Sequence, residues 1–243
     1  MPTMVNIPVT DESLCKLSIQ ELAPMIRDRE VSPVEVLTAS VARIERLQPR
    51  LCGFITEMFE QAHEVASERE IAIAKNEYLG PLDGIPVGVK DNLAVAGVAA
   101  TVGAKANADF IPEADAEAVR RLRAAGAIVI GKENMHEFAA GGRSNNPYYG
   151  AVKNPWDADR IPGGSSGGGG ANVAACLTFA SLGTDVGGSV RFPSLLWRSW
   201  NESDLWQGKS AWFPADMGAW RPCRSTKQER CRFRADVAGL FRS

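Results

Sequence analysis

The order of apolar and polar positions divides the first part of the chain into short elements. Two amphipathic helices come first, over 18–26 and 32–47, each behind a Ser-x-x-Glu capping box, and Pro33 occupies the favoured first helical position of the second. A strand over 52–56 and a longer helix over 58–75 follow. Residues 1–14 have no such period and predict a loose tail.

The next segment switches between strand and helix patterns. Compact apolar runs at 85–89 and 127–130 predict strands. Between them, Asp115 is expected to cap a helix over 116–125, and Gly126 ends it. A helix, a glycine and a strand in this order form half of a β-α-β crossover, which favours parallel pairing and an α/β fold.

A glycine-dense stretch over 163–193 stands out from the rest of the chain. It reads GGSSGGGGANVAACLTFASLGTDVGGSVRFP, in which two glycine-rich loops each carry serine. An apolar run joins them and predicts a helix over 168–177 and a buried strand over 177–184. Such glycine density is typical of backbone that turns sharply or approaches a ligand closely.

Three other interpretations of this stretch fit less well. A phosphate-binding loop needs Lys followed by Ser or Thr after its last glycine, where this chain has Ala171. A nucleophile elbow needs a preceding strand and a later histidine, but 157–162 is polar and the only histidines, His63 and His136, come earlier. A flexible linker would not be followed by an ordered apolar run and a second Gly-Gly-Ser.

The two loops resemble the signature of the amidase signature family. G-G-S-S-G-G is followed, after an intervening stretch, by G-T-D-x-G-G-S-x-R-x-P. Upstream, LDGIPVGVKDN is similar to the family's lysine motif, and GKENMHEF and Asn154-Pro155 are similar to its next two landmarks. These matching segments are 82–92, 131–138, 154–155, 163–168 and 183–193. Together they place most of residues 15–195 in the family's order.

The resemblance implies a Ser-Ser-Lys triad. Ser189 would be the nucleophile, Ser165 a bridging serine on a cis peptide bond, and Lys90 a base that has to be neutral. A lysine held in a dry site has a lowered pKa, which frees its amine. The oxyanion would be bound by the backbone N–H of Ser189 together with those of Val186, Gly187 and Gly188.

Supporting roles follow from the same resemblance. Ser166 would make a secondary polar contact that holds Lys90 or Ser165. Asp185 and Arg191 would form a supporting ion pair without a chemical role. We expect no metal and no cofactor, because the sequence has no Cys-x-x-Cys pair and no His/Cys cluster.

The implied fold is a three-layer α/β/α arrangement around a mixed, largely parallel sheet, with the C-terminal part missing. The implied activity is that of an amidase, a serine hydrolase that cleaves a small-molecule carboxamide to an acid plus ammonia or an amine. A homodimer is compatible with the full-length form. Two alternatives stay open: the A subunit of a glutamyl- or aspartyl-tRNA amidotransferase, which works with partner subunits, and an inert fragment without enzymatic activity.

Beyond residue 195 the resemblance ends, and all but one of the six tryptophans lie there. Tryptophan has the single codon TGG, which read from its second base always begins GG and encodes glycine. In that frame glycines fall where the family has them, at 197, 200, 206 and 212. We therefore expect a frameshift near codons 195–196. Residues 1–195 would be the N-terminal part of an amidase domain and 196–243 an unstructured, out-of-frame tail, which leaves the chain inactive and prone to aggregate.

Composition adds limits on location and partners. The chain is 45% hydrophobic and 23% charged with a formal net charge of −2, which is ordinary for a globular protein and gives no support for nucleic-acid binding. No apolar run has the length of a membrane span, and no secretory signal pattern opens the chain. The 5 scattered cysteines favour reduced thiols and a cytoplasmic location.

Overall fold

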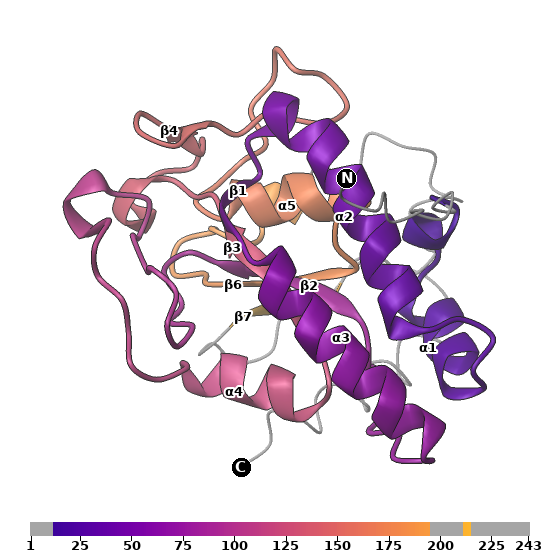
Figure 1. Ribbon diagram of the computed structural model, residues 1–243. Coiled ribbons are helices and arrows are strands. Elements are labelled where there is room, and N and C mark those ends of the chain that lie inside the picture. The colour runs from indigo at the N-terminus through magenta and orange to yellow at the C-terminus, as the bar shows by residue number, and fades with distance from the viewer. Residues whose placement is uncertain (1–11, 195–210, 215–243) are drawn as a thin grey trace, which may run out of the picture.

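A mixed sheet organises the computed structural model, which describes residues 12–194 and 211–214 (Figure 1). Its five strands lie in the order β1-β3-β2-β6-β7, and β4 and β5 form a separate two-stranded sheet. The elements are, in chain order, η1 Leu14–Lys16, α1 Ile19–Arg27, α2 Pro33–Leu51, β1 Phe54–Glu57, α3 Phe59–Ala74, β2 Pro86–Lys90, η2 Lys105–Asn107, α4 Glu117–Ala124, β3 Ile128–Glu133, η3 Glu137–Ala139, β4 Asn145–Asn146, β5 Gly150–Ala151, α5 Gly167–Ala174, β6 Ala180–Gly183 and β7 Ala211–Pro214.

Strand direction confirms the predicted α/β class. β2 runs parallel to both β3 and β6, and only β1 is antiparallel to its neighbour β3. Every residue of β2 and β3 is buried, as parallel strands are when helices cover both faces of a sheet. The sheet is therefore mixed and largely parallel.

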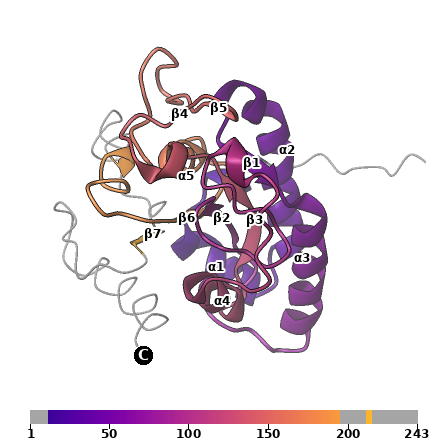
Figure 2. The same ribbon diagram turned by 90° about the vertical axis from the view of Figure 1, so that its left-hand side faces the viewer.

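Alternation along β3 builds the core on both faces of the sheet. Val129 belongs to a cluster with residues of α1 and α4, whereas Ile128 and Ile130 belong to a second cluster with residues of α2 and α3. In both ribbon views α5 lies above β2, β3, β6 and β7, and α4 lies below them (Figure 1, Figure 2). Helices thus cover both faces, which confirms the three-layer arrangement.

The predicted side-chain caps are present on two of three helices. The capping boxes of α1 and α2 are both formed, by Ser18 with Glu21 and by Ser32 with Glu35. The expected cap of α4 is wrong, because Asp115 Oδ1 accepts the N–H of Ala96, in the segment after β2, and no side chain caps this helix. The carboxylate therefore joins α4 to the segment after β2, since its other oxygen lies 3.4 Å from Arg123 Nε of the same helix.

Part of the predicted tail has structure. Residues 211–214 form β7, which pairs in parallel with β6 from Ala180↔Ala211 to Gly183↔Pro214. The expectation of an unstructured tail is corrected for these four residues, since the free edge of β6 offers backbone groups that an apolar run can pair with. The rest of 196–243 and residues 1–11 of the loose tail predicted over 1–14 lie outside the described residues. The tail prediction is wrong for the end of that range, where Glu12 forms ion pairs with Arg43 and Arg46 and Leu14 begins η1.

No helix in the described parts of the chain is both long and apolar enough to cross a membrane.

Candidate active site

Three chain segments meet at the carboxyl-terminal edge of the sheet. β2 ends at Lys90 and its parallel neighbour β6 ends at Gly183, so the residues that follow both strands share one edge. α5 begins at Gly167, shortly after Ser165, and packs against both strands. The fold thus brings together a lysine and the two glycine-rich loops, far apart in sequence.

Lys90 extends its amine into this edge and is only 1% exposed. Its Nζ lies 2.8 Å from Ser165 Oγ, 3.0 Å from Thr184 Oγ1 and 3.3 Å from the carbonyl oxygen of Thr184. Asn92 Nδ2 donates to the same Thr184 Oγ1 at 2.9 Å. The amine is therefore held by oxygen atoms, and no carboxylate in the described residues forms an ion pair with it.

Burial controls the charge of this lysine. It lowers the pKa of Lys90 to about 7, although the carboxylates of Asp185 and Glu133 act in the opposite direction. A large fraction of the amine is then neutral near pH 7. The structure supports the expectation that this lysine is dry instead of extending to solvent.

The backbone of Ser165 is held through its carbonyl oxygen. The bond from Gly164 to Ser165 is cis, as the resemblance implied. The carbonyl oxygen of Ser165 accepts the N–H of His136 at 3.0 Å and the hydroxyl of Ser144 at 3.3 Å. Backbone contacts thus hold the serine while its hydroxyl faces Lys90.

Ser189 lies beside this pair, on the second loop. Its carbonyl oxygen accepts the N–H of Ser166 at 3.1 Å, which joins the two loops. Its own hydroxyl makes no hydrogen bond to any residue that the structure describes, so the contact from Ser165 to Ser189 is not formed here. Ser189 is half-buried, in contrast to the buried Lys90 and Ser165.

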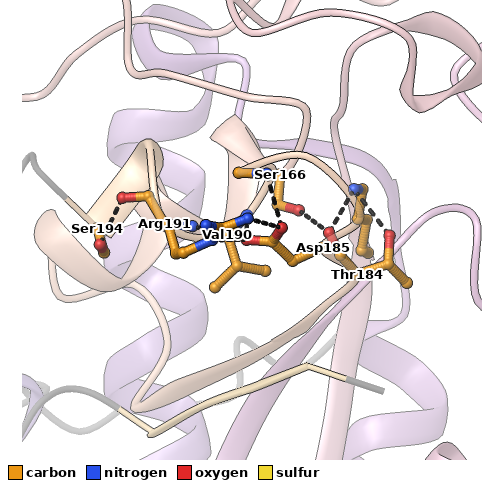
Figure 3. Close-up of polar contacts among 8 residues, drawn as sticks. Ser166, Thr184, Asp185, Val190, Arg191 and Ser194 are labelled. Atoms are coloured by element: carbon orange, nitrogen blue, oxygen red, sulfur yellow. Dashed lines mark hydrogen bonds and ion pairs between the residues drawn. The ribbon is translucent and has the colours of Figure 1, made fainter. Parts of the chain in front are cut away.

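A carboxylate organises the loop that carries Ser189 (Figure 3). Asp185 accepts the backbone N–H groups of Gly188, Val190 and Arg191 at 2.7, 3.0 and 3.1 Å, and the Arg191 guanidinium through two bonds. Burial opposes the ionisation of Asp185, but these hydrogen bonds outweigh it and hold the pKa of that carboxyl below its usual range. The predicted ion pair is therefore present, and it shapes the turn.

The expected oxyanion donors are only partly available. Gly188 cannot serve in this conformation, because its N–H donates to Asp185 Oδ1. Val186 is 87% exposed, and neither its N–H nor that of Gly187 donates to a backbone oxygen of the described chain. The loop's carboxylate thus competes for one of the predicted donors, which corrects the expectation for Gly188.

Ser166 acts differently from its expected role, and the sequence did not single out Thr184, a partner of Lys90, or Asn92, a partner of Thr184. Ser166 Oγ donates to the carbonyl oxygen of Thr184 at 3.4 Å and contacts neither Lys90 nor Ser165 through that hydroxyl. Thr184 and Asn92 both lie inside the quoted motifs, next to Asp185 and two residues after Lys90, and that position was the available signal.

The mixed α/β sheet thus places a buried lysine and two serine-bearing loops together at its carboxyl edge. The chain belongs to the amidase family, whose model matches residues 35–196. It is 44% identical over 182 residues to the A subunit of the glutamyl-tRNA(Gln) amidotransferase of Lachnoclostridium phytofermentans, an alignment that covers 74% of this chain and 37% of the relative. The chain thus spans little more than a third of that relative's length.

Solved structures agree with this family. The peptide amidase from Stenotrophomonas maltophilia is 34% identical with a TM-score of 0.69, over 73% of this chain and 38% of that chain. A bacterial aryl acylamidase of the amidase signature family is 29% identical with a TM-score of 0.70, over 73% and 37%. Sequence and fold therefore support the same family.

Proposed function

We propose that this chain carries the catalytic lysine and serines of an amidase, a serine hydrolase that cleaves the carbon–nitrogen bond of a carboxamide. The observation that carries the proposal is the 2.8 Å contact between Lys90 Nζ and Ser165 Oγ at a buried site. In this proposal Ser189 is the nucleophile, Ser165 relays the proton, and Lys90 is the base. Membership of the amidase family supports all three roles.

The donors and acceptors around Lys90 Nζ support this residue as the proton acceptor. A neutral amine has two hydrogens and one lone pair. The carbonyl oxygen of Thr184 can only accept, so it takes one hydrogen. Thr184 Oγ1 has two lone pairs, one filled by Asn92 Nδ2 and the other by the second hydrogen of Lys90. The lone pair of the neutral Nζ is then left for the hydroxyl hydrogen of Ser165, whereas the charged amine donates to Ser165 Oγ.

The proposed reaction proceeds through an acyl-enzyme. Ser189 Oγ attacks the substrate carbonyl carbon while its proton passes to Ser165 Oγ, whose own proton passes to Lys90 Nζ. The protonated Lys90 returns that proton through Ser165 to the leaving nitrogen, and the carbon–nitrogen bond breaks. Water then attacks the ester along the same relay and releases the carboxylic acid. The backbone N–H groups of Val186 and Gly187 are the proposed donors to the oxyanion.

A second candidate function is that of the A subunit of an amidotransferase. The relatives named as this subunit of the glutamyl-tRNA(Gln) enzyme, at 44% identity, favour it. In that case the same serines would release ammonia from glutamine, and the release would depend on partner subunits. Ammonia release from glutamine only in the presence of such subunits distinguishes it from an independent amidase.

The test of the nucleophile uses a protein whose reading frame is restored near codon 196. A fluorophosphonate probe is expected to label it at Ser189, and Ser189→Ala should lose both the label and nearly all amide hydrolysis, because the covalent step disappears. Ser194→Ala is the matched control, since its hydroxyl only donates to the carbonyl oxygen of Arg191. Labelling that survives in Ser189→Ala would contradict the assignment.

A further inference from the structure

A second ionisable residue ends the strand next to Lys90. Glu133 is the last residue of β3 and is paired in register with Lys90, the last residue of β2. Register partners on parallel strands direct their side chains to the same face of the sheet. Glu133 is 1% exposed, as is Lys90. The sheet thus places a buried acid directly beside the proposed base.

The carboxyl of Glu133 lies in a closely fitting niche of polar groups and glycines. Ser181 Oγ makes a short hydrogen bond to Oε2, and Asn172 Nδ2 donates to Oε1 at 3.3 Å. A Cβ added at Gly88 would lie 2.0 Å from Oε1, and one at Gly169 would lie 2.7 Å from Oε2. Glycines on β2 and α5 therefore leave the space that this carboxyl fills.

Few other charges face this niche. The sequences of α5 and β6 contain no titratable residue. On the other face of β3, Lys132 is paired with Asp91. Asp185 follows β6 and is bound by Arg191.

The remaining carboxyl on the neighbouring strand is more distant. Glu57 of β1 is in register with Gly131, two residues before Glu133. In the described part of the chain, Glu133 forms no ion pair within salt-bridge distance. Lys90 is the cation whose charge acts on it.

Burial shifts the pKa values of Glu133 and Lys90 in opposite directions, and the charge of each group opposes the shift of the other. Burial raises the pKa of Glu133 well above its ordinary value, while hydrogen bonds from Ser181 and Asn172 and the charge of Lys90 oppose the rise. Burial lowers the pKa of Lys90, and the charge of Glu133 opposes that fall. Two groups that interact in this way titrate as a pair.

We propose that Glu133 is a positioning residue for the proton of Lys90: the buried pair shares its protons, and the ionised form of Glu133 retains a proton on the amine and so raises the pH at which Lys90 becomes a free base. The inference gives the proposed relay a residue that tunes its base. Only its consequence for catalysis rests on the proposed function, because the interaction between the two charges is a property of the buried pair.

The test follows the titration of Lys90 directly in the 243-residue protein. Protein labelled with ¹³C at lysine is titrated by NMR, and the Lys90→Arg spectrum assigns the resonance by its loss. In Glu133→Gln, which keeps the shape and removes the charge, the midpoint of Lys90 is expected to move about one pH unit lower. Glu57→Gln removes a carboxyl from an edge strand of the same sheet and should leave the midpoint unchanged.

An unchanged or raised midpoint in Glu133→Gln would overturn the proposal and leave Glu133 a packing residue. Where that variant does not fold, Ser181→Ala provides the second test. It removes a hydrogen-bond donor that stabilises the carboxylate, so the midpoint is expected to shift in the same direction by a smaller amount. A midpoint that stays unchanged in Ser181→Ala would also overturn the proposal.

Neither measurement requires turnover, which keeps this inference separate from the proposed function. A lowered midpoint in a protein whose frame-restored form hydrolyses no amide would contradict the proposed function and retain the coupling. Where hydrolysis is present, the acid limb of the pH–rate profile is expected to shift with the NMR midpoint, which a purely structural role of Glu133 would not cause.

Discussion

A lysine at the end of a buried strand can extend to solvent or keep its amine dry, and these two outcomes have opposite chemical consequences. Lys90 has the second outcome, because its Nζ is surrounded by Ser165 and Thr184 and its side chain is 1% exposed. The cost of keeping a charge in that position lowers the pKa of Lys90 to about 7. One residue therefore combines position and protonation state in a way that suits a base.

The role of Lys90 predicts both a pH dependence and a substitution effect. The neutral fraction of the amine grows as pH rises through about 7, so kcat/KM of the frame-restored enzyme should rise over the same interval. Lys90→Arg keeps a positive charge that cannot be removed at these pH values, and should lose nearly all turnover. Steady-state kinetics across pH measure both effects.

Lys75→Arg is the control for that substitution, because Lys75 is exposed at the end of α3. It should retain the parent activity and pH profile. Parent-like turnover in Lys90→Arg would show that another group accepts the proton.

At the scale of the elements, the connection from α4 to β3 shows that a glycine which ends a helix can also be required by tertiary packing. Gly126 has φ +84° and ends α4, as the sequence predicted. A Cβ there would lie 2.3 Å from Asp83 Oδ1. Asp83 is buried and accepts from Arg69 and from the N–H of Leu79. The glycine thus meets a backbone requirement and also leaves room for a buried ion pair.

Two alanine substitutions separate these requirements. Gly126→Ala and Gly97→Ala both place a side chain at positive φ, which costs about 1 kcal/mol. Gly97, at φ +75°, has nothing within 4 Å of the added Cβ, so its cost should stop there. Gly126→Ala must also displace the carboxylate of Asp83, and we expect a total of about 3 kcal/mol in the free energy of unfolding.

Urea denaturation of the purified variants measures the difference between the two glycines. Equal losses of stability would show that Asp83 and Arg69 move aside at little cost.

For the whole molecule, the family match shows where the amidase-like sequence lies. The family model matches residues 35–196. The match ends at the position where the tryptophan pattern changes. This agreement supports the proposal that 196–243 is read out of frame.

The frameshift proposal predicts a specific coding sequence. One base gained or lost near codon 196 should restore glycine codons at 197, 200, 206 and 212 and continue as amidase-like sequence. The unrestored 243-residue chain is expected to show no amide hydrolysis under conditions where the restored protein is active. Sequencing the coding DNA and assaying both proteins measures this. A second frame without amidase-like sequence, or turnover by the unrestored chain, would refute the proposal.

The sequence by itself determined the elements and the candidate triad. Capping boxes, a helix-ending glycine and short apolar runs act over a few neighbouring residues, so α1, α2, β2 and β3 could be predicted from local patterns. Lys90, Ser165 and Ser189 could be predicted because they lie inside motifs that resemble a family. Their chemical roles remain a proposal.

Only the tertiary structure decided which groups share the site and which are already occupied. Strand order brings Thr184 and Glu133 beside Lys90, and register pairing over such sequence distances has no local signal. Asp115 accepts the N–H of Ala96 in place of an N–H at the start of its helix, and Gly188 donates to Asp185 in place of a free oxyanion site. Hydrogen-bond partners are chosen by proximity in space once the chain is packed, because buried polar groups have to be satisfied by whatever lies nearby.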